Sequence, residues 1–234
     1  MSTLSNAALS SGKIVARTAS VHIDNACNNF LHDCFKPFGI QVVALAGDPV
    51  VALQRQKFEA CLLRLYDPDA EAILNAARNS LSNRHMVIYG VARNTKEALR
   101  YSNYGINAVF DEPLERSSVL KMVRATRPLV MNELRRYARV PVVSEALVET
   151  NSGRAVAMTV EVSCGGLSVR SRTPLSSRES VRVTLSLPGL SRLSLRAFIC
   201  WARAADKVYG LRFDPSDERR LKIRGWIDQF LETV

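Results

Sequence analysis

The residues best suited to bind an anion form a short arginine cluster, Arg135-Arg136-Tyr137-Ala138-Arg139. A guanidinium group is always charged, and its fork of N–H donors matches the oxygens of a phosphate bidentately. The spacing of four between Arg135 and Arg139 is not specific by itself, because three other pairs share it, Arg178/Arg182, Arg192/Arg196 and Arg220/Arg224. What distinguishes the cluster is its place just before the first of a series of predicted β-strands.

A second motif lies two strands later, Glu161-Val162-Ser163-Cys164-Gly165-Gly166. Together the two motifs resemble the signature of the PilZ family of cyclic di-GMP receptors, an RxxxR pair ahead of the first strand and a (D/N)xSxxG motif at the end of the next. The resemblance covers roughly residues 133–232. It extends to Arg139-Val140-Pro141-Val142 and Tyr209-Gly210-Leu211-Arg212-Phe213, which look like the family's first and last strands.

The resemblance implies roles for the residues of both motifs. Arg135, Arg136 and Arg139 would bind the phosphates and guanine edges of cyclic di-GMP, because a guanidinium can also bond guanine O6 and N7. Ser163 and Gly166 would line the floor of the site, and the Gly165-Gly166 pair would let the backbone approach the ligand with no side chain in the way. We therefore expect a ligand-binding protein rather than an enzyme, with no cofactor.

Glu161 departs from the family pattern, which has Asp or Asn at this position. Its carboxylate can still accept hydrogen bonds from guanine N1 and N2, but the extra methylene changes its reach by more than the roughly half-ångström tolerance of a preorganised site. An alternative therefore stays open: a PilZ-like adaptor that no longer binds the nucleotide and acts only through protein–protein contacts. In that case the arginine cluster is a solvated basic linker.

The elements that must position these motifs are short strands. From residue 140 onward, apolar residues alternate with polar ones, which is the period of half-buried antiparallel strands. Such alternation also predicts that Val156, Met158, Val160 and Val162 share one face of a strand. Further strands are predicted at Leu167–Ser171, Val181–Leu187, Leu193–Arg203 and Val208–Phe213, with a helix at Asp217–Thr233. Because open edges invite aggregation, we expect a closed six-stranded antiparallel PilZ-like β-barrel with a C-terminal helix.

The amino-terminal half instead alternates short apolar runs with helical stretches. This order favours a parallel sheet covered on both faces, a doubly wound (flavodoxin-like) α/β domain. The candidate strands are Ile14–Ala16, Ile40–Ala46, Ala60–Leu65, Met86–Tyr89 and Ala108–Phe110. The candidate helices are Asn25–Phe35, Pro49–Lys57, Asp69–Leu81 and Thr95–Tyr104.

This half resembles a response-regulator receiver domain over about residues 13–127. Arg64 occupies the place of the phosphoacceptor aspartate, Glu112 replaces the lysine before Pro113, and Arg17-Thr18-Ala19 stands where an acidic pair is expected. Without those carboxylates there is no hard-oxygen Mg²⁺ site and no nucleophile, so we expect a pseudo-receiver that is not phosphorylated. Arg64 and Glu112 have two interpretations: a charge-swapped ion pair, or two unrelated surface residues.

A basic stretch, Leu114–Leu134, separates the halves, and Pro128 is expected to end or kink its helix. The predicted division is a disordered amino terminus (1–12), the pseudo-receiver (13–127), a linker with the arginine motif (128–139) and the barrel (140–234). The pseudo-receiver would serve as a dimerisation surface or dock an unknown protein partner.

The composition indicates a folded cytoplasmic protein, and the resemblances to the PilZ and receiver families imply a bacterial signalling protein. Hydrophobic residues make up 47% and the five scattered cysteines fit reduced thiols. We expect neither a secretory signal nor a membrane span. Residues 135–234 hold 17 Lys/Arg against 10 Asp/Glu, +7 of the net charge of +10, which favours an anionic partner. Nucleic acid is disfavoured because no stacking aromatic pattern is evident, and a metal site because His22, Cys27, His32 and Cys34 fit no zinc spacing.

Overall fold

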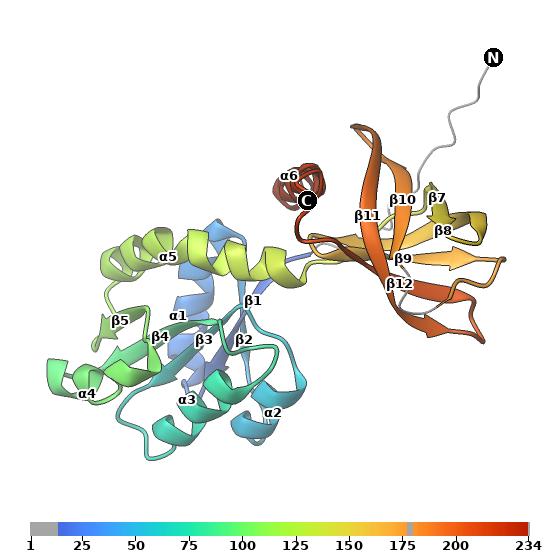
Figure 1. Cartoon of the computed structure of the whole chain (residues 1–234). Coiled ribbons are helices and arrows are strands. Elements are labelled where there is room, and N and C mark those ends of the chain that lie inside the picture. Colours follow the sequence, from blue (N-terminus) through green and yellow to red (C-terminus); the bar gives the residue numbers. More distant parts are fainter. Residues whose placement is uncertain (1–13, 177–179, 234) are drawn as a thin grey trace. The chain divides into compact units, whose positions relative to one another are not determined.

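The computed structural model describes residues 14–176 and 180–233, so the predicted disordered terminus (1–12) lies outside the described residues. The chain forms two compact units (Figure 1), one over Val15–Leu134 and the other from Arg135 onward. The boundary between them falls inside the range 128–139 that the sequence predicts as a linker.

The first unit is a five-stranded parallel sheet in the order β2-β1-β3-β4-β5, which confirms the predicted doubly wound α/β fold. Helices α1 and α5 lie on one face of the sheet, and α2 and α3 on the other (Figure 1). The strands are β1 (Ala16–Val21), β2 (Ile40–Ala44), β3 (Ala60–Arg64), β4 (Val87–Ala92) and β5 (Ala108–Asp111). The helices are α1 (Asn25–Phe35), α2 (Pro49–Arg55), α3 (Ala70–Asn79), α4 (Thr95–Arg100) and α5 (Arg116–Tyr137), with 3-10 turns η1 (Lys36–Phe38) and η2 (Ser102–Tyr104).

The first strand lies later than predicted. Strand β1 is Ala16–Val21 rather than Ile14–Ala16, and Arg17-Thr18-Ala19 is inside it rather than after it. Sequence periodicity missed the strand because Thr18 and Ser20 are polar yet buried. The Ser20 hydroxyl donates to Asn28 Oδ1 at 2.5 Å, so its burial is compensated by a hydrogen bond.

Pro128 was expected to end or kink the helix, and the expected end is wrong, because α5 continues past it. The helix runs unbroken from Arg116 to Tyr137 with the proline inside it. An interior proline removes one backbone hydrogen bond and costs about 3 kcal/mol. The helix is held by its packed stripe, Val119, Val123, Val130 and Leu134, which is buried, and by the Tyr89 hydroxyl, which lies 2.7 Å from Thr126 Oγ1. Tertiary packing thus outweighs the local preference.

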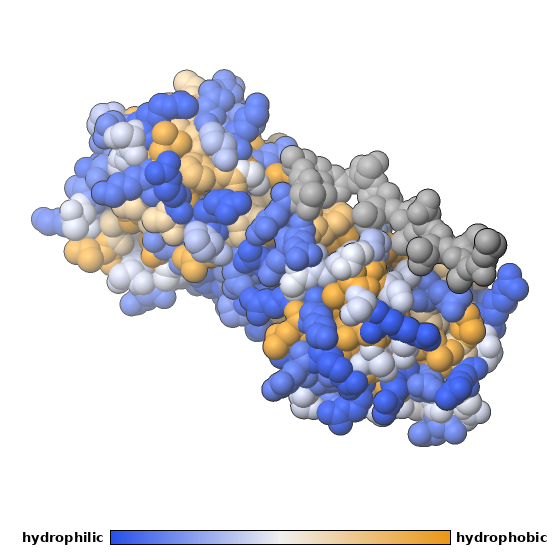
Figure 2. Space-filling model, turned by 90° about the horizontal axis from the view of Figure 1, so that it is seen from above, coloured by the Kyte–Doolittle hydropathy of each residue, from blue (hydrophilic) through white to orange (hydrophobic). Residues whose placement is uncertain are grey.

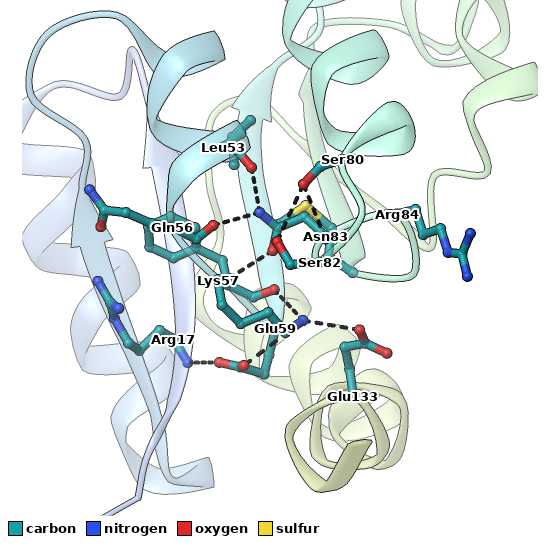
Figure 3. A network of polar contacts seen from close by, with 12 residues as sticks. Arg17, Leu53, Gln56, Lys57, Glu59, Ser80, Ser82, Asn83, Arg84 and Glu133 are labelled. Atoms are coloured by element: carbon teal, nitrogen blue, oxygen red, sulfur yellow. Dashed lines mark hydrogen bonds and ion pairs between the residues drawn. The ribbon is translucent and has the colours of Figure 1, made fainter. Parts of the chain in front are cut away.

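A polar network fastens the end of α5 inside the first unit (Figure 3). Lys57 Nζ lies 3.0 Å from Glu133 Oε1 and 4.0 Å from Glu59 Oε1, and it also donates to the Phe58 carbonyl. Glu59 accepts the Arg17 backbone N–H at 2.7 Å, and burial raises the pKa of Glu59. The partly buried Lys57 therefore forms ion pairs with two buried carboxylates. Through this lysine, Glu133 of α5 is held near the start of β3.

The second unit is a closed barrel of six antiparallel strands, as predicted. Strand order is β8-β7-β10-β11-β12-β9, and a further pairing of β8 with β9 closes it. The strands are β7 (Glu145–Thr150), β8 (Gly153–Ser163), β9 (Gly166–Ser171), β10 (Ser180–Leu187), β11 (Leu190–Arg203) and β12 (Val208–Phe213), with a two-residue strand β6 (Val140–Pro141) added to β8. Among the described residues, closure pairs each of the six long strands with a neighbour on both sides.

The predicted closing helix is α6 (Arg220–Thr233). Its buried residues Ile223, Trp226 and Ile227 belong to the barrel core, and Trp226 Nε1 donates to the Pro188 carbonyl at 2.8 Å. The indole thereby buries its ring and still satisfies its only polar atom.

Two β-bulges interrupt the barrel's alternation. In β8, Thr159 pairs with Val169 and Glu161 with Ser168, so Val160 is an extra residue. In β11, Ile199 pairs with Leu211 and Trp201 with Gly210, so Cys200 is extra. A bulge reverses the side-chain phase of the strand residues after it.

The predicted shared face of Val156, Met158, Val160 and Val162 is therefore wrong. Ala155, Ala157 and Thr159 point to the core before the bulge, and Val162 does so after it, whereas Val156 and Met158 are exposed. Alternation shows that a strand exists, but a bulge hides which residues face the core.

Hydrophilic residues cover most of the visible surface of both units, with hydrophobic patches between them (Figure 2). None of the described helices combines the length and the apolar character needed to span a lipid bilayer.

Candidate functional site

One pocket of the barrel unit brings most of the predicted site residues together. It has a volume of about 380 Å³ and lies over β9, β12 and the end of β11. It is lined by Arg136, Tyr137, Arg139, Ser163, Gly165, Gly166, Leu167, Ser168, Cys200, Trp201, Gly210, Leu211 and Arg212. Three of the described lining residues are arginines and none is acidic, which suits an anion.

Small residues form part of the floor of the pocket. Gly166 and Ser168 of β9 pair with Arg212 and Gly210 of β12, and Gly210 pairs on its other side with Trp201 of β11. The small residues Gly166, Ser168 and Gly210 thus lie next to one another, with the larger side chains of Arg212 and Trp201 beside them. The hollow lies at these small residues.

The arginine cluster reaches the pocket from the last turn of α5 and the segment just after it. Arg139 stands directly before β6, whose Pro141 pairs with Glu161 of β8. Arg139 Nη1 donates to Glu161 Oε1 at 2.9 Å, and the Arg139 side chain remains 61% exposed. The β8 bulge precedes Glu161 and aims its carboxylate at Arg139.

Arg135 is not among the residues that line the pocket. Its Nε lies 2.7 Å from Asp228 Oδ1 of α6, and both side chains are partly buried. The structure therefore separates the predicted cluster: Arg136 and Arg139 line the pocket, while Arg135 is paired to the closing helix.

The second motif forms a tight turn between β8 and β9. The Ser163 hydroxyl donates to the Gly166 carbonyl at 2.9 Å. A Cβ atom on Gly166 would lie 2.1 Å from the Leu211 carbonyl oxygen, whereas one on Gly165 would meet no described atom within 4 Å. Gly166 is thus required by the close approach of β12, and only Gly165 leaves open space on the pocket side.

The predicted site residues did not include several residues that line the pocket: Tyr137, Leu167, Ser168, Cys200, Trp201, Gly210, Leu211 and Arg212. Alternation alone places Trp201 on the same face as the core residue Ile199, and the bulge that turns it outward leaves no signal in the residue pattern. Trp201 could have been singled out by its residue type, because tryptophan is rare in this chain, which has only two.

The carboxyl edge of the first unit's sheet gathers charges of both signs. Arg64 Nη2 lies 2.5 Å from Asp24 Oδ2 and 3.8 Å from Glu112 Oε1. Glu112 also accepts the Tyr66 hydroxyl at 2.7 Å and lies 3.6 Å from Arg93 Nε. Arg64 and Glu112 are therefore within ion-pair distance, but the shorter contact of Arg64 is with Asp24.

Asp24 changes the interpretation of this edge. Because β1 ends at Val21, an acid lies just beyond the strand on this edge, and the expectation of no carboxylate there is wrong. The Cys27 backbone N–H, followed by the Arg64 guanidinium, holds the pKa of Asp24 well below its usual range. Within the described ranges, no three His, Cys, Asp or Glu residues are grouped to hold a metal ion.

Comparisons with known proteins bear on both units. Residues 133–229 match the PilZ domain family. No curated protein matches the chain.

Among solved structures, the chain is similar to a chemotaxis response regulator of Vibrio cholerae, with 14% identity over 47% of this chain and 98% of the other, at a TM-score of 0.42. It is similar to a CheY-like receiver domain protein of Methanospirillum hungatei, with 18% identity over 51% and 98%, at a TM-score of 0.43. A third similarity is to the PilZ domain of CeSA from a cellulose-synthesizing bacterium, with 19% identity over 39% and 98%, at a TM-score of 0.33.

Proposed function

We propose that the PilZ domain of this chain, residues 133–229, captures cyclic di-GMP in the pocket lined by Arg136, Arg139, Ser163 and Gly166. The observation that carries this proposal is that predicted site residues from separate segments of the chain meet at one pocket. Residues from the end of α5, the β8–β9 turn and β12 meet at one hollow whose described lining holds three arginines and no acid.

The ligand's chemistry matches this lining. Cyclic di-GMP has two phosphodiester charges, and Arg136 and Arg139 offer guanidinium forks that bind phosphate oxygens or guanine O6 and N7. Gly165 would let a flat base approach the backbone closely. Binding would thus combine charge neutralisation with contact to the bases.

Arg135 has a different role in this proposal. Its ion pair with Asp228 holds the start of the arginine segment against α6. Arg136 and Arg139 would contact the ligand, and Arg135 would fix the direction from which they approach. We expect Arg135→Ala to weaken binding less than Arg139→Ala does.

Glu161 makes the ligand compete for Arg139. The ion pair is solvent-exposed on the arginine side, and such pairs contribute at most about 1 kcal/mol. Releasing Arg139 from Glu161 therefore costs roughly fivefold in affinity, far less than a bound phosphate contributes. The departure from the family motif weakens binding without abolishing it.

The proposed output is a change in orientation between the two units. Helix α5 carries Glu133, which is fastened to Lys57, and ends at Tyr137 beside the pocket. A ligand that pulls the arginine segment onto the barrel shifts this orientation by its differential affinity for the two arrangements. The pseudo-receiver would present the result to a protein partner or a second copy, within the cytoplasm. Small-angle scattering with and without cyclic di-GMP tests the reorientation, and sedimentation tests the homodimer.

The alternative, an adaptor without ligand, is favoured by one observation, the Arg139–Glu161 ion pair that occupies part of the arginine cluster. Titration calorimetry of the intact chain with cyclic di-GMP separates the two. Binding that is weakened by Arg139→Ala but not by Arg192→Ala, an exposed arginine outside the pocket, supports the receptor. Absence of heat at several hundred micromolar ligand would leave only the adaptor.

A further inference from the structure

Trp201 has an unusual position for a tryptophan. Its side chain is 40% exposed and lines the pocket, whereas Trp226 is 7% exposed and lies in the core. Burial of a large aromatic ring is strongly favourable, so an exposed indole beside a basic pocket calls for a reason. The bulge at Cys200 is what turns Trp201 away from the core.

The indole lies directly on the backbone of β12. A Cβ atom on Gly210 would be 2.0 Å from Trp201 Cε2 and 2.1 Å from its Nε1. Trp201, Gly210 and Ser168 form one row across β11, β12 and β9. Glycine at 210 therefore lets the ring rest against the pocket floor.

One guanidinium lies near this ring, and further arginines line the same pocket. The Arg203 guanidinium carbon is 5.6 Å from the Trp201 ring centroid, and Arg139 and Arg212 line the same pocket. An aromatic face next to guanidinium groups is the combination that binds a nucleobase joined to a phosphate: the ring stacks on the base and the cations hold the charge.

We infer that Trp201 is the stacking platform for a purine base of the bound dinucleotide. Gly210, which has no side chain, lets the indole pack against β12 in the position that stacking requires. This inference rests on the proposed function and adds to it the residue that holds the base. Stacking does not distinguish guanine from adenine, because every base has a π-face. Reading of the base edge is left to polar groups such as Arg139 and Ser163.

Two variants test the platform by calorimetry with cyclic di-GMP. Trp201→Ala removes the ring and should weaken binding roughly 5- to 150-fold, the range for one stacked base. Gly210→Ala keeps the ring but displaces it, and should cause a loss of the same order. The control is Gly225→Ala in α6, where a Cβ atom meets no described atom within 4 Å; it should leave affinity unchanged. Thermal melting verifies that each variant is folded.

Tryptophan fluorescence gives an independent measurement. Cyclic di-GMP should quench the emission of the wild-type chain. In Trp201→Phe, which keeps an aromatic ring, calorimetric binding should persist while quenching disappears, because only the buried Trp226 remains.

The outcomes separate the two proposals. Wild-type binding with unchanged affinity in Trp201→Ala and Gly210→Ala would overturn the platform and leave the proposed function standing. Wild-type binding with quenching retained in Trp201→Phe would also overturn it. Absence of wild-type binding by both methods would overturn the proposed function and the platform with it.

Discussion

Two arginine-containing clusters, the sheet edge of the first unit and the barrel pocket, differ in how their charges are balanced. At the sheet edge of the first unit, Arg64 is 19% exposed and lies between Asp24 and Glu112. In the barrel pocket, Arg139 is 61% exposed, and its partner Glu161 stands outside the lining. The first cluster is internally neutralised and the second has excess positive charge, so only the second offers a site for an anion.

The difference also separates stability from binding. An arginine held between two carboxylates contributes to the fold and has little left to offer a ligand. Arginines around a floor of glycine and serine contribute little to packing and can exchange water for phosphate. Substitutions in the two clusters should therefore change different measured quantities.

The largest expected effect is the loss of the positive charge at the pocket. The double variant Arg136→Ala/Arg139→Ala removes two charge-assisted contacts of roughly 1.5–3 kcal/mol each, so affinity for cyclic di-GMP should fall by about 100-fold or more by calorimetry. The melting temperature should barely change. A double variant that binds cyclic di-GMP like the wild type would contradict the claim that the pocket arginines form the anion site.

The next effect concerns the floor of the pocket. Gly166→Ala places a Cβ atom 2.1 Å from the Leu211 carbonyl oxygen, and should lower the free energy of unfolding by roughly 2–3 kcal/mol in urea titrations. Gly165→Ala is the matched control and should change it by less than about 0.5 kcal/mol. Equal effects of the two variants would show that the close approach of β9 and β12 is not what requires glycine.

A smaller effect is expected at the neutralised cluster. Arg64→Ala leaves Glu112 without one of its cations and should lower the free energy of unfolding of the first unit by roughly 1–2 kcal/mol. Affinity for cyclic di-GMP should be unchanged. The exposed Arg55→Ala serves as control, and an Arg64 variant that loses ligand binding would contradict the division of roles.

The smallest effect is expected at Glu161, the acid that pairs with Arg139 beside the pocket. Glu161→Gln keeps the shape and removes the charge, so Arg139 is released and affinity should rise by at most about fivefold. The gain should shrink as salt is added, because an exposed ion pair is screened. A large loss of affinity instead would mean that Glu161 itself binds the ligand.

The sequence predicts the architecture well because burial patterns repeat along each element. Parallel strands alternating with helices, and a barrel with a closing helix, follow from periodicity, and both are confirmed. Periodicity did not predict two local details. The position of β1 was missed because Thr18 and Ser20 are polar yet buried, and the continuation of α5 past Pro128 was missed because it depends on tertiary packing. These depend on contacts between distant residues, which a single sequence does not display.

For the site, sequence motifs identified one side of the pocket only. Arg136, Arg139, Ser163 and Gly166 carry a recognisable spacing, and the structure brings them together. Trp201 lies on β11, far along the chain from these motifs, and a β-bulge turns its side chain away from the core. The motifs therefore give no indication of it. The separate position of Arg135 likewise depends on Asp228, which lies far away in the sequence.

The most direct test of the account is a map of backbone amide shifts in the ¹⁵N-labelled chain during titration with cyclic di-GMP. The account predicts that the largest changes lie at 136–139, 163–168, 200–201 and 210–212, with little change at Asp24, Arg64 and Glu112. Changes confined to the sheet edge of the first unit, or none at saturating ligand, would contradict it.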